Sequence, residues 1–145
     1  MAKYDFEGVY NYSIDQRKRV FIPANLRSEL GEEFIVFAPL GKSKFLVIYP
    51  ADEWEKFYEN VQNTYTGAMR AKMERYYTSM KKRTSPDKQG RITLTDVLCE
   101  RAGLTKDALI AGVGNRIEIW SPENWAKEFE DIENLDLDDE NLPTL

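Results

Sequence analysis

The 145-residue chain is long enough for one compact domain or for two small halves sharing a core, and its 42% hydrophobic content is typical of a globular protein. No run approaches the ~20 apolar residues of a membrane helix, and the N-terminal residues lack the apolar stretch of a secretory signal. The single cysteine excludes an intrachain disulfide, and without histidine the commonest general base and transition-metal ligand is missing. We therefore expect no cofactor, no metal and no enzymatic activity.

The net charge of −5 is unevenly distributed. Residues 128–145 hold eight acidic and no basic residues, which leaves 17 acidic against 20 basic residues in 1–127, a net charge of +3. A mildly basic body with an acidic tail often marks nucleic-acid contact or a tail that masks the body. A solvated, flexible terminus is the simpler interpretation, and the sequence leaves both open.

In chain order, residues 4–13 are predicted to be extended, and a strand over 19–22 follows a turn at Asp15. A short helix is predicted next, with Pro23 in its first turn and Gly31 ending it in the left-handed conformation. Its inward positions are Leu26 and Leu30.

Two further strands, Phe34–Phe37 and residues 45–49, flank a turn at Gly41. A helix then closes this first unit. Its apolar positions follow the i, i+3, i+4, i+7 pattern of a core-facing helix and comprise Trp54, Phe57, Tyr58 and Val61.

Residues 66–83 are predicted to form a connecting helix with an apolar stripe of Met69, Met73, Tyr76 and Met80. The other face carries six bases against Glu74 alone: Arg70, Lys72, Arg75, Lys81, Lys82 and Arg83. This basic face is either solvated or in contact with phosphate.

The same organisation then repeats. A strand is predicted over 91–94, followed by a helix with Thr95 as cap and Gly103 at its end. Strands over 108–112 and 116–120 flank a turn at residues 114–115, and a last helix begins with Ser121 as cap and Pro122 in the first position. The predicted inward positions of the two helices are Val97, Leu98 and Ala102, and Trp125, Phe129 and Ile132.

The two units match position by position at a constant offset, so that Leu26 corresponds to Leu98. One residue is then lost from the second copy, after which the match continues and Tyr49 corresponds to Trp120. Two copies are too few for a solenoid and suggest a pseudo-two-fold pair around a shared core.

This repeat sets the expected domain organisation. We expect a first repeat over residues 1–62 and a basic connecting helix over 63–83. A second repeat over 84–132 and a flexible acidic tail over 133–145 should follow.

Each unit contains an Asp-x-x-x-Arg phrase that leads into an apolar strand. An Asp carboxylate favours turns by accepting backbone N–H groups two residues on, and a strand pair with basic tips fits a DNA major groove. The structural alternative is an Asp–Arg pair that only steadies a turn. The candidate DNA-binding residues are Asp15, Arg17, Lys18, Arg19, Asp87, Lys88, Gln89, Gly90 and Arg91.

Together, these phrases with "GVY", "IPANLR", "KQGRI" and "GNRIEIWSPENW" resemble the MraZ family of bacterial transcriptional regulators, over roughly residues 8–132. The resemblance implies an α+β fold of two swapped-hairpin, AbrB-like (looped-hinge) repeats that form a pseudo-two-fold β core with flanking helices. It also implies ring-shaped homo-oligomers that bind short tandem repeats in the promoter of the division and cell-wall gene cluster, with the two loops contacting double-stranded DNA. Lys18 departs from the family by replacing its usual glycine, and Thr95 by replacing its usual proline.

We therefore expect a sequence-specific DNA-binding regulator that is cytoplasmic, associated with the nucleoid and independent of membranes. A DNA-independent oligomeric interaction or scaffold module is the alternative. Burial of the basic loop tips at subunit contacts would favour that alternative.

Overall fold

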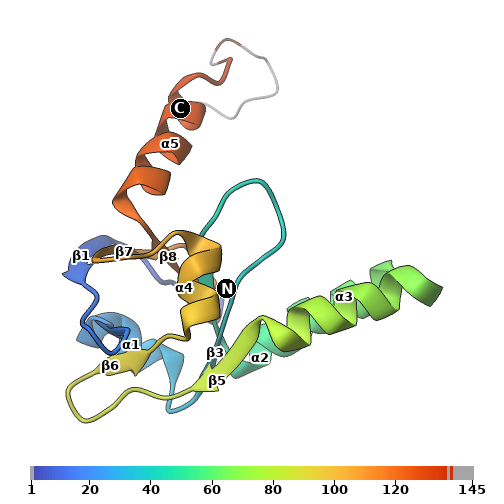
Figure 1. Ribbon diagram of the computed structural model, residues 1–145, viewed down its shortest axis with the longest axis horizontal. Helices are drawn as coiled ribbons and strands as arrows, with labels where there is room; N and C mark the ends of the chain where they lie inside the picture. Colours follow the sequence, from blue (N-terminus) through green and yellow to red (C-terminus); the bar gives the residue numbers. More distant parts are fainter. Residues whose placement is uncertain (1, 137, 139–145) are drawn as a thin grey trace.

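A computed structural model describes residues 2–136 and 138 of the chain (Figure 1). The first half consists of β1 (Val9–Ser13), β2 (Arg19–Phe21), α1 (Ala24–Leu30), β3 (Phe34–Phe37), β4 (Leu46–Pro50) and α2 (Ala51–Thr64). After α3 (Gly67–Ser79), the second half consists of β5 (Lys81–Thr84), β6 (Arg91–Thr93), α4 (Asp96–Ala102), β7 (Asp107–Gly112), β8 (Ile117–Trp120) and α5 (Pro122–Glu133). Most of the expected flexible tail lies outside the described residues.

The strands form a six-stranded antiparallel sheet in the order β1-β7-β8-β4-β3-β5 and a two-stranded ribbon of β2 with β6. The first strand of each half pairs with the other half: β1 lies beside β7, and β5 lies beside β3. This exchange is the swapped-hairpin arrangement, and the predicted α+β fold of two repeats is confirmed.

Strand register shows how closely the halves match. In the ribbon Val20 lies opposite Ile92, which is its own equivalent in the second repeat. In the sheet Val47 lies opposite Glu118, which is again its equivalent in the second repeat. A pseudo-two-fold axis therefore passes between both pairs and relates the two halves.

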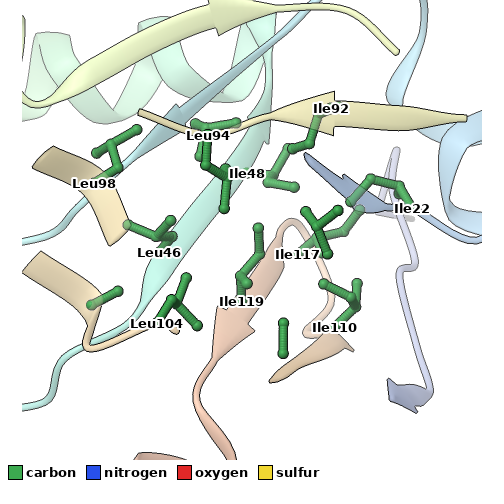
Figure 2. Packing of buried hydrophobic residues seen from close by; sticks show 14 of the residues in the cluster. Ile22, Leu46, Ile48, Ile92, Leu94, Leu98, Leu104, Ile110, Ile117 and Ile119 are labelled. Atoms are coloured by element: carbon green, nitrogen blue, oxygen red, sulfur yellow. The ribbon is translucent and has the colours of Figure 1, made fainter. Parts of the chain in front are cut away.

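The main core lies between the ribbon, α1 and α4 on one side and one face of the sheet on the other (Figure 2). Its centre consists of fully buried isoleucines from both halves: Ile22, Ile48, Ile92, Ile110, Ile117 and Ile119. Burying each such side chain contributes about 1.5–3 kcal/mol, and because β2 and β6 pair only with each other, this packing holds the ribbon to the sheet.

The opposite face of the sheet carries a second apolar cluster under α2 and α3. Alternate residues of β3 divide between the layers, Val36 in the main core and Ile35 and Phe37 in the second cluster, because successive strand side chains point to opposite faces. Trp54 of α2 is 3% exposed and contacts Phe37 edge-on, which confirms its predicted core role.

The connecting segment differs from the single helix expected over 63–83. Helix α2 runs on to Thr64, α3 ends at Ser79, and Met80 caps α3 by donating its backbone N–H to the Tyr76 carbonyl. The next residues form β5 at the edge of the sheet. Lysine is tolerated there because an edge strand has one open side.

Three smaller expectations were wrong. Gly31 has a positive φ of 84° but a ψ of −171°, so α1 ends in a residue with a backbone conformation that essentially only glycine adopts, not in a left-handed helical residue. Val97 is 52% exposed because α4 turns Leu98 and Ala102 inward, about 100° and 140° around the helix from it. The third is the predicted burial of the apolar face of α5.

Helix α5 begins as predicted, with the Ser121 hydroxyl accepting the Asn124 N–H and Pro122 in the first turn. Its apolar face is not buried, however: Phe129 and Ile132 are 45% and 46% exposed. The helix leans out from the body (Figure 1), with no counterpart of α3 beside it among the described residues. Within the described part of the chain, every helix is too short or too polar to span a membrane.

Candidate nucleic-acid interface

The first loop, residues 15–19, is organised by the carboxylate of Asp15. Its Oδ1 accepts the backbone N–H groups of Arg17 and Arg19 at 2.9 and 2.8 Å. Its Oδ2 accepts Nε of Arg19 at 2.6 Å. One carboxylate thereby fixes both the turn and the side chain that leaves it.

The second loop, residues 87–91, repeats this network. Oδ1 of Asp87 accepts the backbone N–H groups of Gln89 and Arg91, both at 2.9 Å, and Oδ2 accepts Nε of Arg91 at 3.0 Å. The turn-steadying contact expected from the Asp-x-x-x-Arg spacing is therefore present twice, with the same donors and acceptors.

Both carboxylates stay ionised. The pKa of Asp15 is lowered chiefly by the backbone N–H of Arg19, and the pKa of Asp87 chiefly by the backbone N–H of Arg91. Hydrogen bonds to the charged form favour ionisation. The loops consequently keep one charge state at physiological pH.

Lys18 takes the conformation of a glycine. Its φ is +62°, and that of Gly90, its equivalent, is +84°. The carbonyl of Lys18 accepts the N–H of Leu94 at 2.8 Å, and the carbonyl of Gly90 accepts the N–H of Ile22 at 3.0 Å. Each loop is thus tied to the other half of the chain, and the lysine leaves the backbone of the first loop unchanged.

The ribbon sets the positions of the two loops. Because β2 and β6 are antiparallel, the first loop enters at one end of the ribbon and the second loop at the other. Arg91 lies opposite Phe21, two residues along the ribbon from Arg19, so the two arginine backbones are roughly 7 Å apart along the strand direction. Val20 and Ile92 point into the core, which leaves both arginines on the outer face.

The loop tips reach solvent in the isolated protomer. Arg17, Lys88 and Gln89 are exposed, and Lys18 is partly exposed. The side chains of Arg19 and Arg91 are 27% and 29% exposed. Gly90 is buried. The structure therefore brings the predicted residues together in two matched clusters, one at each end of the ribbon.

Two side chains close to the loops were not predicted from the sequence to belong to the site. Phe21 lies on the outer face of the ribbon, 5.1 Å from the ring of Tyr12. The guanidinium of Arg27 from α1 lies 5.4 Å from the Phe21 ring. Neither belongs to the Asp-x-x-x-Arg phrase, and the only available signal for Arg27 was its place in "IPANLR".

This geometry defines the class of protein. It is a swapped-hairpin protein built from two matched halves, with a basic loop at each end of an exposed ribbon. A sequence model of the family described as "MraZ protein, putative antitoxin-like" matches residues 6–74 and 81–142.

Curated relatives agree with this match. Transcriptional regulator MraZ of Lachnoclostridium phytofermentans is 37% identical over 131 residues, covering 90% of each chain. The protein of the same name from Heliobacterium modesticaldum is 41% identical over 123 residues, 84% of this chain and 85% of the relative. That of Oenococcus oeni is 40% identical over 121 residues, 83% of each.

The chain belongs to the MraZ family. The resemblance inferred from the sequence is confirmed, and so is the expectation that the chain is not an enzyme, since its relatives are named as transcriptional regulators.

Proposed function

We propose that this protein is a transcriptional regulator that binds short tandem repeats in the promoter of the bacterial division and cell-wall gene cluster, through its two Asp-x-x-x-Arg loops. The names of the relatives support regulation of transcription. The observation that carries the proposal is the repeated loop network at both ends of one exposed ribbon. In this role the protein acts in the cytoplasm, on the nucleoid.

The geometry suggests a division of labour within each loop. Nε of Arg19 and Nε of Arg91 are held by the aspartates, which presents the rest of each guanidinium in a fixed direction. Arginine pairs bidentately with guanine O6 and N7, and a two-stranded ribbon fits the major groove. Arg17, Lys18 and Lys88 lie at the tips and contact phosphates, which position the protein without reading sequence.

Assembly into a ring-shaped homo-oligomer completes the proposal. Two loops give one protomer a small footprint for a specific DNA interface. The exposed apolar side of α5 offers a contact for a second copy, because Phe129 and Ile132 border a hollow that is also lined by Phe45, just before β4, and Trp120 of β8. Protomers on adjacent repeats then combine weak contacts through effective concentration.

The alternative is a scaffold that assembles in the same way but does not bind DNA. The exposed face of α5 is compatible with it, because that face implies self-association only. The two functions predict different solvent exposure of the loops in the oligomer. A scaffold would bury Arg17 and Lys88 between protomers, whereas a DNA-binding ring leaves them exposed.

The decisive experiment is a mobility-shift titration of the protein on its own upstream promoter region and on random DNA, over a series of salt concentrations. We expect log affinity to fall linearly with log salt, with a slope near −0.9 per phosphate neutralised. Arg19→Ala should cost about 1–3 kcal/mol on the promoter and reduce its preference over random DNA. A flat salt response, or an unchanged preference in a folded Arg19→Ala protein, would contradict the proposal.

A further inference from the structure

The two loops differ in where the positive charge beside them comes from. Position by position in the repeat, Lys18 corresponds to Gly90, and Arg27 corresponds to Cys99. At the first loop the cation is in the loop itself, and a small residue stands in α4. The second loop carries Lys88 but has glycine at position 90, and the cation next to that position is Arg27 of α1.

At the second loop, the guanidinium of Arg27 fills the space that a side chain at position 90 would occupy. A Cβ added to Gly90 would lie 2.6 Å from Cζ of Arg27. Nε of Arg27 donates to the carbonyl of Ile22 at 2.7 Å, and the N–H of Ile22 donates to the carbonyl of Gly90 at 3.0 Å. Arg27 is thus fixed directly against the loop, at its residue of positive φ.

At the first loop the equivalent position carries its own side chain, Lys18, and the equivalent of Arg27 is Cys99. The backbone of Lys18 is held by Leu94, the equivalent of Ile22, at 2.8 Å. Cys99 lies buried in α4, where an arginine would stand if the halves were identical. Burial raises the pKa of the Cys99 thiol, and the charge of Lys18 is close enough to oppose that shift.

We propose that Arg27 is a DNA-contacting residue, which adds beside Lys88 of the second loop the phosphate-binding cation that Lys18 adds to the first. The ligand is a backbone phosphate of double-stranded DNA, so this inference rests on the proposed function. No salt bridge to Arg27 is found among residues 2–136 and 138, so its charge is not neutralised by a described carboxylate. Arginine presents a planar fork of donors that matches phosphate oxygens.

The test moves the charge from the helix back to the loop. In full-length protein, Arg27→Ala and Lys18→Ala should each lower the magnitude of the salt slope by about 0.9 and weaken binding to promoter and random DNA alike. The double variant Arg27→Ala with Gly90→Lys should restore the slope, because it gives the second loop the arrangement of the first. Lys18 itself demonstrates that a lysine can hold the required positive φ.

A matched control removes one charge elsewhere. Lys56 lies on α2, across the sheet from the ribbon, and Lys56→Ala should leave the slope unchanged. Restoration by the relocated lysine distinguishes a phosphate contact from a structural role of Arg27, since Arg27 bonds to the Ile22 carbonyl whereas Lys18, in the position equivalent to 90, makes no side-chain hydrogen bond to the equivalent Leu94 carbonyl among the described residues.

Melting curves and light scattering on each variant verify folding and assembly. If Arg27→Ala does not fold, Arg27→Gln keeps a long side chain with an N–H donor while removing the charge, and the same slope comparison applies. A wild-type slope in Arg27→Ala, or in its Gln replacement, overturns the inference, and so does a folded double variant whose slope stays low. If the wild-type protein itself shows no salt-dependent DNA binding, the result instead rejects the proposed function.

Discussion

Lys18 combines backbone strain with a position at the proposed DNA contact. A non-glycine residue at φ +62° costs on the order of 1 kcal/mol or more relative to glycine. Lys18→Gly should therefore raise the melting temperature by a few degrees, while weakening DNA binding and flattening its salt dependence. Thermal unfolding and filter binding on the same preparation measure the two effects. If Lys18→Gly lowers the stability and leaves DNA binding unchanged, the Lys18 side chain stabilises the fold by packing and does not contact DNA.

Asp52 ties the N-terminal segment to α2. It accepts Nζ of Lys3 at 2.7 Å and the hydroxyl of Tyr4 at 2.6 Å. The bond from Lys3 is the main reason that the pKa of Asp52 falls to about 2. Because this folded-state pKa lies below the ordinary value of 3.8, the stabilisation is complete above about pH 4 and is lost as the pH falls towards 2.

Asp52→Asn should accordingly remove part of the acid sensitivity of the protein. The carboxylate is 35% exposed, so the effect should not exceed about 1 kcal/mol. Denaturant titrations of both proteins at pH 6 and pH 3 test this. The wild-type protein should lose more stability than Asp52→Asn between the two values, and an equal loss would mean that the Lys3 contact contributes nothing measurable.

Helices α2 and α5 occupy equivalent places in the repeat but differ in burial. Trp54 of α2 is 3% exposed, whereas Phe129 and Ile132 of α5 are nearly half exposed. Replacing both α5 residues with Ser should leave the free energy of unfolding of the protomer within about 1 kcal/mol, but should disrupt self-association. Trp54→Ala should instead cost about 3–5 kcal/mol. Light scattering and denaturant unfolding of the variants separate the two effects, and an intact oligomer in the α5 variant would place the subunit contact elsewhere.

Local patterns in the sequence predicted most strands and helices because each half carries strong turn, cap and periodicity signals. Ser121 and Thr95 cap the helices that they were expected to cap. The swapped-hairpin arrangement was predicted from the family resemblance alone, and the strand partners were not predicted, since alternation shows which face of a strand is buried but not which strand lies beside it. Residues 81–83 were wrongly predicted to continue the connecting helix, because a run of bases after a helical stripe suits either a helix face or an edge strand.

The candidate site was predictable where it is local in the chain. Asp15 and Arg19 are close neighbours in the sequence, and their contact follows from turn chemistry. Arg27 and Gly90 belong to different repeats and meet only because α1 and the second loop pack together across the pseudo-two-fold axis. The exchange of Lys for Gly and of Arg for Cys between the halves is visible in the sequence, but its meaning depends on that packing.

Cooperation between protomers should appear in the response to repeat number. If neighbouring protomers bind neighbouring repeats, DNA with two tandem repeats should bind roughly 100-fold or more tightly than DNA with one. Inserting about half a helical turn, roughly 5 base pairs, between the repeats should remove most of this gain, because the second loop pair then faces the wrong side of the duplex. Titrations of the three DNA fragments measure the gain directly, and equal affinities would argue for independent protomers.

Joining the two halves in one chain gives the protomer a direction along DNA. Two identical chains about a true two-fold axis would present the same loop at both ends and could not distinguish one direction of a duplex from the other. In this chain a half-turn exchanges Gln-Arg-Lys in the first loop for Lys-Gln-Gly in the second, so the protein has a front and a back. If the binding sites all have the same orientation along the DNA, the bound protomers would all have the same orientation too. The front surface of each protomer would then contact the back surface of the next.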